Sequence, residues 1–167
     1  MSSQVLSNQR TQALEAWVRL LRAHASATRA LSAELDAEHG LTINDYEALL
    51  HLSRAEEHAL RRVDLAGQLL LTPSGITRLL DGLERDGLVC KRTCESDARV
   101  TYAVLTDAGA KKLAEASRSH VTAVRALFEQ RFSQDELATL AEFLERLPGA
   151  GDADGEDCKA TSAERSR

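Results

Sequence analysis

The first regular pattern in the chain is a stripe of apolar side chains between residues 14 and 35. Their spacing alternates between three and four residues, which places them on one face of an α-helix. The stripe runs through Leu14, Trp17, Val18, Leu21, Ala25, Leu31 and Leu35, with Thr28 in the same register. Gly40 follows His39 and suits the left-handed end of a helix. We therefore expect residues 1–40 to contain one long amphipathic helix.

Three shorter helices are predicted between residues 42 and 86. Thr42 or Asn44 can cap the first of them, which carries Tyr46, Leu49, Leu50 and Leu52; a polar stretch, SRAEEHALRR, follows it. The second short helix is marked by Val63, Leu65, Ala66 and Leu69. The third starts at Thr72, a good N-cap, with Pro73 at the first helical position. Its helical spacing puts Ile76, Leu79, Leu80 and Leu83 inward and Ser74, Gly75, Thr77, Arg78 and Asp81 outward.

A single β-hairpin and two helices are expected after Gly87. Residues 88–94 and 100–105 are rich in β-branched residues and flank a polar turn. Thr106 and Asp107 can cap a fifth helix with an apolar repeat, and Ser133 with Glu136 forms a capping box for a sixth that ends near Pro148. The residues after Pro148 are small, polar and acidic and show no periodicity. This composition predicts a disordered tail at 149–167.

This order of elements predicts a mainly α fold, a winged helix-turn-helix with a small hairpin wing. We assign 1–40 to an N-terminal dimerisation helix, 41–106 to the DNA-binding region and 107–148 to C-terminal dimerisation helices. In such a fold the second helix of the motif enters the major groove, and the wing reaches the flanking backbone or minor groove. The candidate DNA-binding residues are Thr72, Ser74, Gly75, Thr77, Arg78, Lys91, Arg92, Asp97 and Arg99.

The candidate residues supply the chemistry that a duplex requires. Hydroxyls of Ser74 and Thr77 can contact phosphates or bases, and the guanidinium of Arg78 can bind guanine through two hydrogen bonds. Gly75 allows a close approach of the backbone. At the wing tip, Asp97 can orient Arg99 for a narrow groove, and a salt-bridged turn of no functional meaning is the alternative.

The same residues resemble the MarR family of bacterial transcription regulators. The matching pieces are the segment LTPSGITRLLDGLERDGLV, the wing with Asp97 and Arg99, and LTDAG at 105–109; the resemblance extends from about Leu14 to Leu147. It implies a homodimer that binds double-stranded DNA at an inverted-repeat operator and is released by a small aromatic effector. Lys91 replaces a common arginine of the family, and Ala98 a frequent basic residue.

Net charge alone argues against a nucleic-acid partner, because 21 basic and 26 acidic residues give a net charge of -5. The acidic excess lies mainly outside the expected reading region. Between Arg61 and Arg99 there are seven basic and six acidic side chains. A slightly positive reading region on an acidic protein is compatible with specific binding that weakens strongly with salt.

The apolar stripes of the first and last two helices are too large for the central motif to cover. Exposed, they would exceed the apolar patch that a monomer tolerates, so we expect them to pair with a second copy, most simply about a two-fold axis. Between such helices and the DNA-binding region, the resemblance implies an effector site. Candidate lining residues are Trp17, His24, Tyr46, His51 and His120, each of which also suits ordinary core or surface roles.

Other classes of function find little support in the sequence. The five His and three Cys show no metal-ligand spacing, no cofactor motif is present, and no catalytic motif indicates an enzyme. No segment is long and apolar enough for a signal peptide or a membrane span, so we expect a cytoplasmic protein. Two alternatives stay open. One is a thiol-based sensor through Cys90. Cys90 lies too far along its strand from Cys94 for a disulfide between the two. The other alternative is a winged-helix module for protein contacts.

Overall fold

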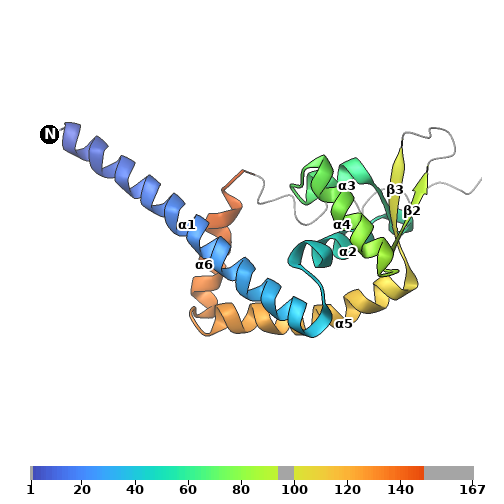
Figure 1. Cartoon of the computed structure of the whole chain (residues 1–167). Coiled ribbons are helices and arrows are strands. Elements are labelled where there is room, and N and C mark those ends of the chain that lie inside the picture. Colours follow the sequence, from blue (N-terminus) through green and yellow to red (C-terminus); the bar gives the residue numbers. More distant parts are fainter. Residues whose placement is uncertain (1, 94–99, 149–167) are drawn as a thin grey trace, which may run out of the picture. The chain divides into compact units, whose positions relative to one another are not determined.

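The computed structural model describes residues 2–93 and 100–148, and the side chains from residue 11 onward within them. The elements are α1 (Ser2–His39), α2 (Ile43–Arg54), a short 3-10 turn η1 (Glu56–His58), β1 (Ala59–Arg61), α3 (Arg62–Gln68), α4 (Pro73–Arg85), β2 (Val89–Thr93), β3 (Thr101–Leu105), α5 (Asp107–Glu129) and α6 (Gln134–Glu145) (Figure 1). The chain divides into two compact units, Met1–Val124 and Arg125–Arg167.

The helix boundaries follow the capping residues that the sequence contains. Gly40 has φ of +64° and ends α1 in the left-handed conformation. Thr42 caps α2 in a reciprocal capping box with Asp45. Thr72 caps α4 by accepting the amide of Gly75, with Pro73 in the first turn. These predicted helix starts are confirmed, whereas α1 begins well before the first residue of the predicted stripe.

The sheet has three strands in the order β1-β3-β2, one strand more than the predicted hairpin. The predicted pair is present, with Lys91 opposite Ala103. The additional strand, β1, lies within the polar stretch after α2 and pairs antiparallel with the other edge of β3, where Leu60 faces Ala103. Three residues are too few to show a strand period in the sequence, and β1 depends on hydrogen bonds that β3 offers only in the folded chain.

The core of the first unit is built mainly from leucine. Leu49, Leu52, Leu65 and Leu80 are fully buried, and Ala103 of β3 is equally inaccessible. These side chains come from α2, α3, α4 and the sheet and form one continuous cluster. Of the four residues of α4 predicted to face inward, Leu79 alone is half-buried, and it still packs against this cluster. The core therefore fixes α4 through one face and leaves its other face to solvent.

The junction between the sheet and α5 is tightly packed. The Thr106 hydroxyl donates to the Gly87 carbonyl at 2.7 Å and accepts the Gly109 amide at 3.0 Å. The Thr106 amide donates to the Leu88 carbonyl at 3.1 Å. A β-carbon added to Gly109 would lie 2.1 Å from that carbonyl oxygen, so no larger residue fits here. The start of α5 is thus fastened to Gly87 and Leu88, the two residues that immediately precede β2.

The first half of α1 leaves its apolar stripe exposed. Leu14 is 64% exposed, Trp17 54%, Val18 41% and Leu21 47%. Leu35, near the other end of the helix, is buried in the core. Only the C-terminal part of α1 therefore contributes side chains to the buried core.

The second unit contains the end of α5 and all of α6. Ser133 and Glu136 form the predicted capping box at the start of α6. The rings of Phe128 and Phe132 lie 6.4 Å apart between their centroids. Apolar side chains of this unit are exposed, among them Phe132, Phe143 and Leu147. The predicted tail at 149–167 lies outside the described residues. No helix in the described part of the chain is both long and apolar enough to cross a bilayer.

Candidate nucleic-acid interface

The exposed face of α4 is formed by its short polar side chains and one arginine. Ser74 and Arg78, one helical turn apart, are exposed, and Asp81 follows them. Gly75 and Thr77 are half-buried. The opposite face is held by Ile76, Leu80 and Leu83 in the core. Of the outward set predicted from the sequence, Ser74, Arg78 and Asp81 are therefore exposed, whereas Gly75 and Thr77 are only partly so.

The first turn of α4 is closed by hydroxyl groups. The Thr72 Oγ1 accepts the Gly75 amide at 3.1 Å and lies 3.2 Å from the Ser74 Oγ. An added β-carbon on Gly75 would lie 3.2 Å from the same Thr72 oxygen, so the glycine keeps room for the cap. The remaining amides at this helix end, together with its partial positive charge, favour a negatively charged group.

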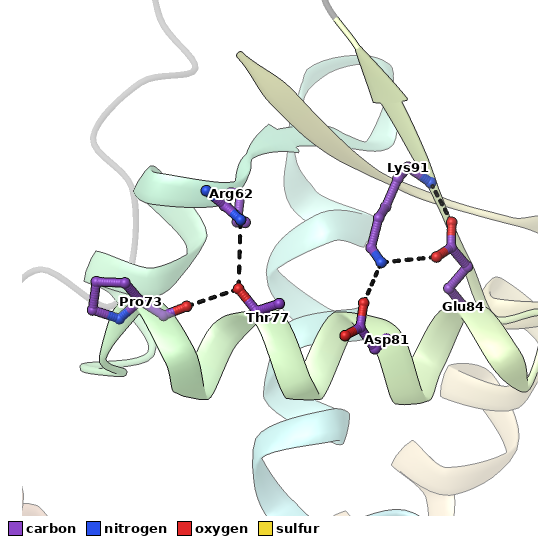
Figure 2. Close-up of polar contacts among 6 residues, drawn as sticks. All are labelled: Arg62, Pro73, Thr77, Asp81, Glu84 and Lys91. Carbon is purple, nitrogen blue, oxygen red and sulfur yellow. Dashed lines mark hydrogen bonds and ion pairs between the residues drawn. The ribbon is translucent and has the colours of Figure 1, made fainter. Parts of the chain in front are cut away.

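Thr77 is connected to a residue that the sequence reasoning did not single out. Its hydroxyl donates to the Pro73 carbonyl at 2.8 Å and accepts from an Arg62 nitrogen at 3.4 Å (Figure 2). Arg62 is the first residue of α3 and is exposed, so its guanidinium stands beside α4. The signal in the sequence was the pair Arg61–Arg62 at a helix start, but the contact joins residues fifteen positions apart and requires the fold to be known.

Lys91 points from β2 back to α4, between two acidic side chains (Figure 2). Its ammonium donates to Asp81 and lies 2.8 Å from Glu84 Oε2. The hydrogen bonds to Asp81 and Glu84 raise the pKa of the lysine, and the hydrogen bond from Lys91 lowers the pKa of Glu84. The ammonium charge is therefore balanced within the protein.

The rest of the predicted wing is only partly described. Arg92 is exposed; its guanidinium lies 3.8 Å from Glu57 and 5.9 Å from the centre of the Tyr102 ring. Asp97 and Arg99 lie outside the described residues, as does Cys94. Cys90 is an exposed free thiol on β2. Arg92 is thus an exposed cation of the wing, and its ion pair is long and solvated.

Two of the five candidate effector residues meet in the structure. The rings of Tyr46 and His120 lie 4.5 Å apart, and the Tyr46 hydroxyl is 3.2 Å from the Ser117 hydroxyl. Among the described side chains, the buried Nδ1 of His120 has no hydrogen-bond partner. Burial lowers the pKa of His120, while nearby Glu34 raises it. The pair joins α2 to α5 within the first unit.

The other three candidates are placed separately. Trp17 belongs to the exposed stripe of α1. His24 acts electrostatically on Glu47 of α2, whose pKa is raised by burial and lowered in part by this histidine. Burial, with a smaller effect of Arg54, lowers the pKa of His51. Within the described part of the chain, ring contacts in this group are confined to Tyr46 and His120.

Over residues 2–93 and 100–148, no three His, Cys, Asp or Glu side chains come together as metal ligands would. The buried core contains no polar or charged side chain in the same part of the chain. The polar groups available for a functional site are therefore those on α4, α3 and the sheet.

Comparison with known proteins agrees with this geometry. The MarR family model matches residues 41–101. The HTH-type transcriptional repressor YetL of Bacillus subtilis (strain 168) is 32% identical over 114 residues, which cover 66% of this chain and 68% of YetL. A second relative, the HTH-type transcriptional regulator MhqR of the same organism, is 24% identical over 136 residues, or 81% of this chain and 91% of MhqR.

Solved structures give the same result. AbsC of Streptomyces coelicolor, a MarR family transcriptional regulator, is 33% identical, with a TM-score of 0.70 over 78% of this chain and 87% of AbsC. Sco3205 of the same organism, a MarR family regulator solved in complex with DNA, is 27% identical, with a TM-score of 0.74 over 81% of this chain and 84% of that chain. The residues matched by the family model include α2, β1, α3, α4 and β2. The chain belongs to the MarR family of transcriptional regulators.

Proposed function

We propose that this chain is a cytoplasmic, homodimeric DNA-binding regulator that represses transcription from an inverted-repeat operator. The observation that carries the proposal is the exposed polar face of α4, with Ser74 and Arg78 outward beside a two-stranded wing. A helix of this kind fits the major groove, which is about 12 Å wide. Sco3205, solved in complex with DNA, and YetL, named a repressor, support this function.

Each half of the dimer is proposed to read DNA through α4. Arg78 binds a base edge, most favourably guanine, because it is exposed and projects from the first half of the helix. Thr72, Ser74 and Gly75 surround the helix start and hold a phosphate there. Arg62 adds a second cation beside Thr77. The phosphate contacts fix the position of the protein on the duplex, and Arg78 alone of these residues reads the sequence.

The wing is proposed to contact the flanking DNA through Arg92 and Arg99. The long ion pair of Arg92 with Glu57 is weak in solvent, so a phosphate can replace the carboxylate at little cost. The expectation for Arg99 is derived from the sequence, where Asp97 stands two positions before it. Replacing Arg99 with Ala should weaken binding uniformly across DNA sequences and flatten its salt dependence.

Dimerisation is proposed through the terminal helices. The exposed stripe of α1 and the exposed aromatic and aliphatic side chains of α6 are the apolar surfaces available for a second copy. Two-fold pairing would present two α4 helices to successive turns of a duplex. This arrangement accounts for the expectation of an inverted repeat.

The experiment begins with genomic fragments captured by the purified protein and sequenced, followed by binding titrations on the fragment most enriched. Arg78→Ala should weaken binding by about 5- to 150-fold, equivalent to about 1–3 kcal/mol, and relax base preference at one position in each half-site. Arg125→Ala, a change of the same kind in the second unit, is the matched control. If no duplex is enriched at low salt, or if Arg78→Ala and Arg125→Ala behave alike, the proposal is wrong.

A second proposal concerns release by a small aromatic acid. The Tyr46 and His120 rings, with the partnerless Nδ1 of His120, offer stacking and one hydrogen bond to such a molecule. Trp17, His24 and His51 are the further candidates for this site. The coupling expected for such a release is about 1–3 kcal/mol. Salicylate should lower the affinity for the operator, and His120→Ala, a change at a partly exposed side chain, should abolish that effect while leaving binding without salicylate intact.

The two alternative functions predict other results. A thiol sensor would lose DNA on treatment with peroxide, and Cys90→Ser would remain bound, since Cys90 is the exposed thiol of β2. A winged-helix module for protein contacts would bind no duplex at any salt concentration. The polar character of the α4 face favours the DNA-binding proposal over this module.

A further inference from the structure

The contact between the wing and α4 rests on one lysine and two carboxylates. Asp81 and Glu84 are three residues apart on α4 and so project from the same side of the helix. Lys91, in the middle of β2, places its ammonium between them. Figure 2 shows the three side chains converging from the two elements. Thr77 lies one turn before Asp81 on the same stripe, so this side of α4 faces the sheet and the start of α3.

Glu84 holds the backbone of β2 as well as its side chain. One carboxylate oxygen accepts the Lys91 amide at 3.3 Å, while the other lies 2.8 Å from the Lys91 ammonium. Because β2 is an outer strand of the sheet, its outward amides have no neighbouring strand to bond. Glu84 provides one such partner from α4. The strand is therefore attached to the helix at a main-chain atom, which a contact between side chains alone would not achieve.

The charges of this cluster argue against a role for Lys91 as a phosphate contact. Two carboxylates outnumber one ammonium, so the cluster has a net negative charge. The lysine side chain is 29% exposed, whereas the aspartate is 51% exposed. A phosphate approaching Lys91 would meet the carboxylates on the same side and would have to break two ion pairs. Lys91 was expected from the sequence to bind DNA; its surroundings suit a different task.

We propose that Lys91 is a positioning residue, which binds Asp81 and Glu84 and thereby fixes the wing at a set distance from the reading helix. This inference rests on the proposed DNA-binding function, because the distance matters only if α4 and the wing contact one duplex together. A wing held in place before binding loses less conformational entropy when DNA is bound. The acidic pair therefore favours DNA binding, although its charge repels DNA.

The decisive variant removes both acids, as Asp81→Asn with Glu84→Gln. If the acids only repel phosphate, their removal frees the Lys91 ammonium and tightens binding. If they hold the wing, their removal weakens specific binding, by about five- to tenfold. The matched control is Glu56→Gln with Asp86→Asn, which removes the same charge from the same region outside the cluster. We expect tighter or unchanged binding for the control and weaker binding for the cluster variant; tighter binding by the cluster variant would overturn the proposal.

A second measurement needs no DNA. In the free protein, amide hydrogen exchange of β2 and β3 should be faster in the cluster variant than in the parent and the control. Lys91→Arg keeps a cation that can bind two carboxylates and should retain slow exchange, whereas Lys91→Gln should not. Equal exchange in all five proteins would overturn the positioning role. Should the double variant unfold, Glu84→Ala alone provides the same test, because it removes both the carboxylate beside the Lys91 ammonium and the acceptor of the Lys91 amide.

The two readouts separate this inference from the function on which it rests. If the parent protein binds no duplex, the proposed function fails, and hydrogen exchange still decides whether Lys91 fixes the wing. If the parent binds its operator and the cluster variant binds more tightly, the function stands and the positioning role is wrong.

Discussion

Leucines in the winged region and on the first half of α1 have opposite surroundings despite similar spacing. Leu49, Leu52 and Leu80 are fully buried, whereas Leu14 is 64% and Leu21 47% exposed. In both regions the apolar positions recur at helical spacing. The winged region finds its partner surfaces within the chain, whereas the α1 stripe is left uncovered by the residues that the structure describes. Periodicity thus predicts which face of a helix is apolar but leaves open whether the partner is the same chain or a second copy.

The largest effect is expected inside the winged region. Leu80→Ala removes a fully buried side chain and should lower the free energy of unfolding by about 2–5 kcal/mol. Chemical denaturation measures this loss, which should be the same at low and high protein concentration if the core belongs to one chain. A loss below 1 kcal/mol would mean that α4 is packed more loosely than the structure shows.

A smaller, concentration-dependent effect is expected on α1. In one chain Leu21 is half-exposed, so burial of the remainder against a second copy contributes about 1 kcal/mol per copy. Leu21→Ala should therefore raise the dimer dissociation constant by about 30-fold, equivalent to about 2 kcal/mol per dimer. Sedimentation equilibrium of the parent and the variant tests this. Arg22→Ala, at an exposed neighbouring position, is the control; equal constants for all three proteins would argue against dimerisation through this stripe.

Leu70 is an exception within the winged region, and its substitution should stabilise the protein. It lies in the turn between α3 and α4, is 92% exposed and has φ of +51°, a left-handed conformation that favours glycine. Leu70→Gly relieves that strain and should raise stability by up to about 1 kcal/mol after the entropic cost of glycine. Leu70→Ala keeps the strain and should be close to neutral. If thermal denaturation ranks the two variants in the reverse order, Leu70 makes a contact that its exposure does not reveal.

The smallest effect concerns pH, at the histidines of α2 and α5. Burial lowers the pKa of His51 and of His120 below the ordinary value of 6.5. Between the folded and unfolded pKa values the unfolded chain binds more protons than the folded chain. The contribution of these two histidines to stability is therefore fully present above pH 6.5 and declines as the pH falls below it. His51→Gln with His120→Gln should flatten the thermal midpoint between pH 7 and 5. An unchanged slope would exclude these two groups as its origin.

At lower pH, acidic groups determine the remaining loss of stability. The pKa of Glu84 is lowered by the hydrogen bond from Lys91, and that of Glu136 by its bonds from Ser133. Their contributions are present above the ordinary value of 4.5 and are lost as the pH falls through the lowered values. The histidine variant should therefore still unfold in acid, below pH 4.5.

Helix positions in this chain follow from local chemistry and were predictable. Thr42, Thr72 and Ser133 each cap a helix through bonds to residues within the first turn, so the signal lies in three or four consecutive positions. The outward face of α4 is equally local, because it is the complement of Ile76, Leu80 and Leu83. The family resemblance rested on the same segment.

Interactions between distant segments were not predictable from the sequence. Strand β1 exists because β3 offers it an edge, and the three residues Ala59–Arg61 show no pattern of their own. Lys91 looks like a free cation in the sequence because Asp81 and Glu84 lie seven to ten positions earlier, on another element. Arg62 was passed over for the same reason, since its contact with Thr77 depends on the packing of α3 against α4.

The packing of Gly109 against the Leu88 carbonyl has a mechanical consequence. With the Thr106 bonds on either side, it joins the first turn of α5 to the base of the wing without an intervening hinge. A tilt of α5 would therefore move the start of β2 with it. Any molecule that shifts α5, whether a second copy or a small ligand beside His120, would in this way change the reach of the wing toward a duplex.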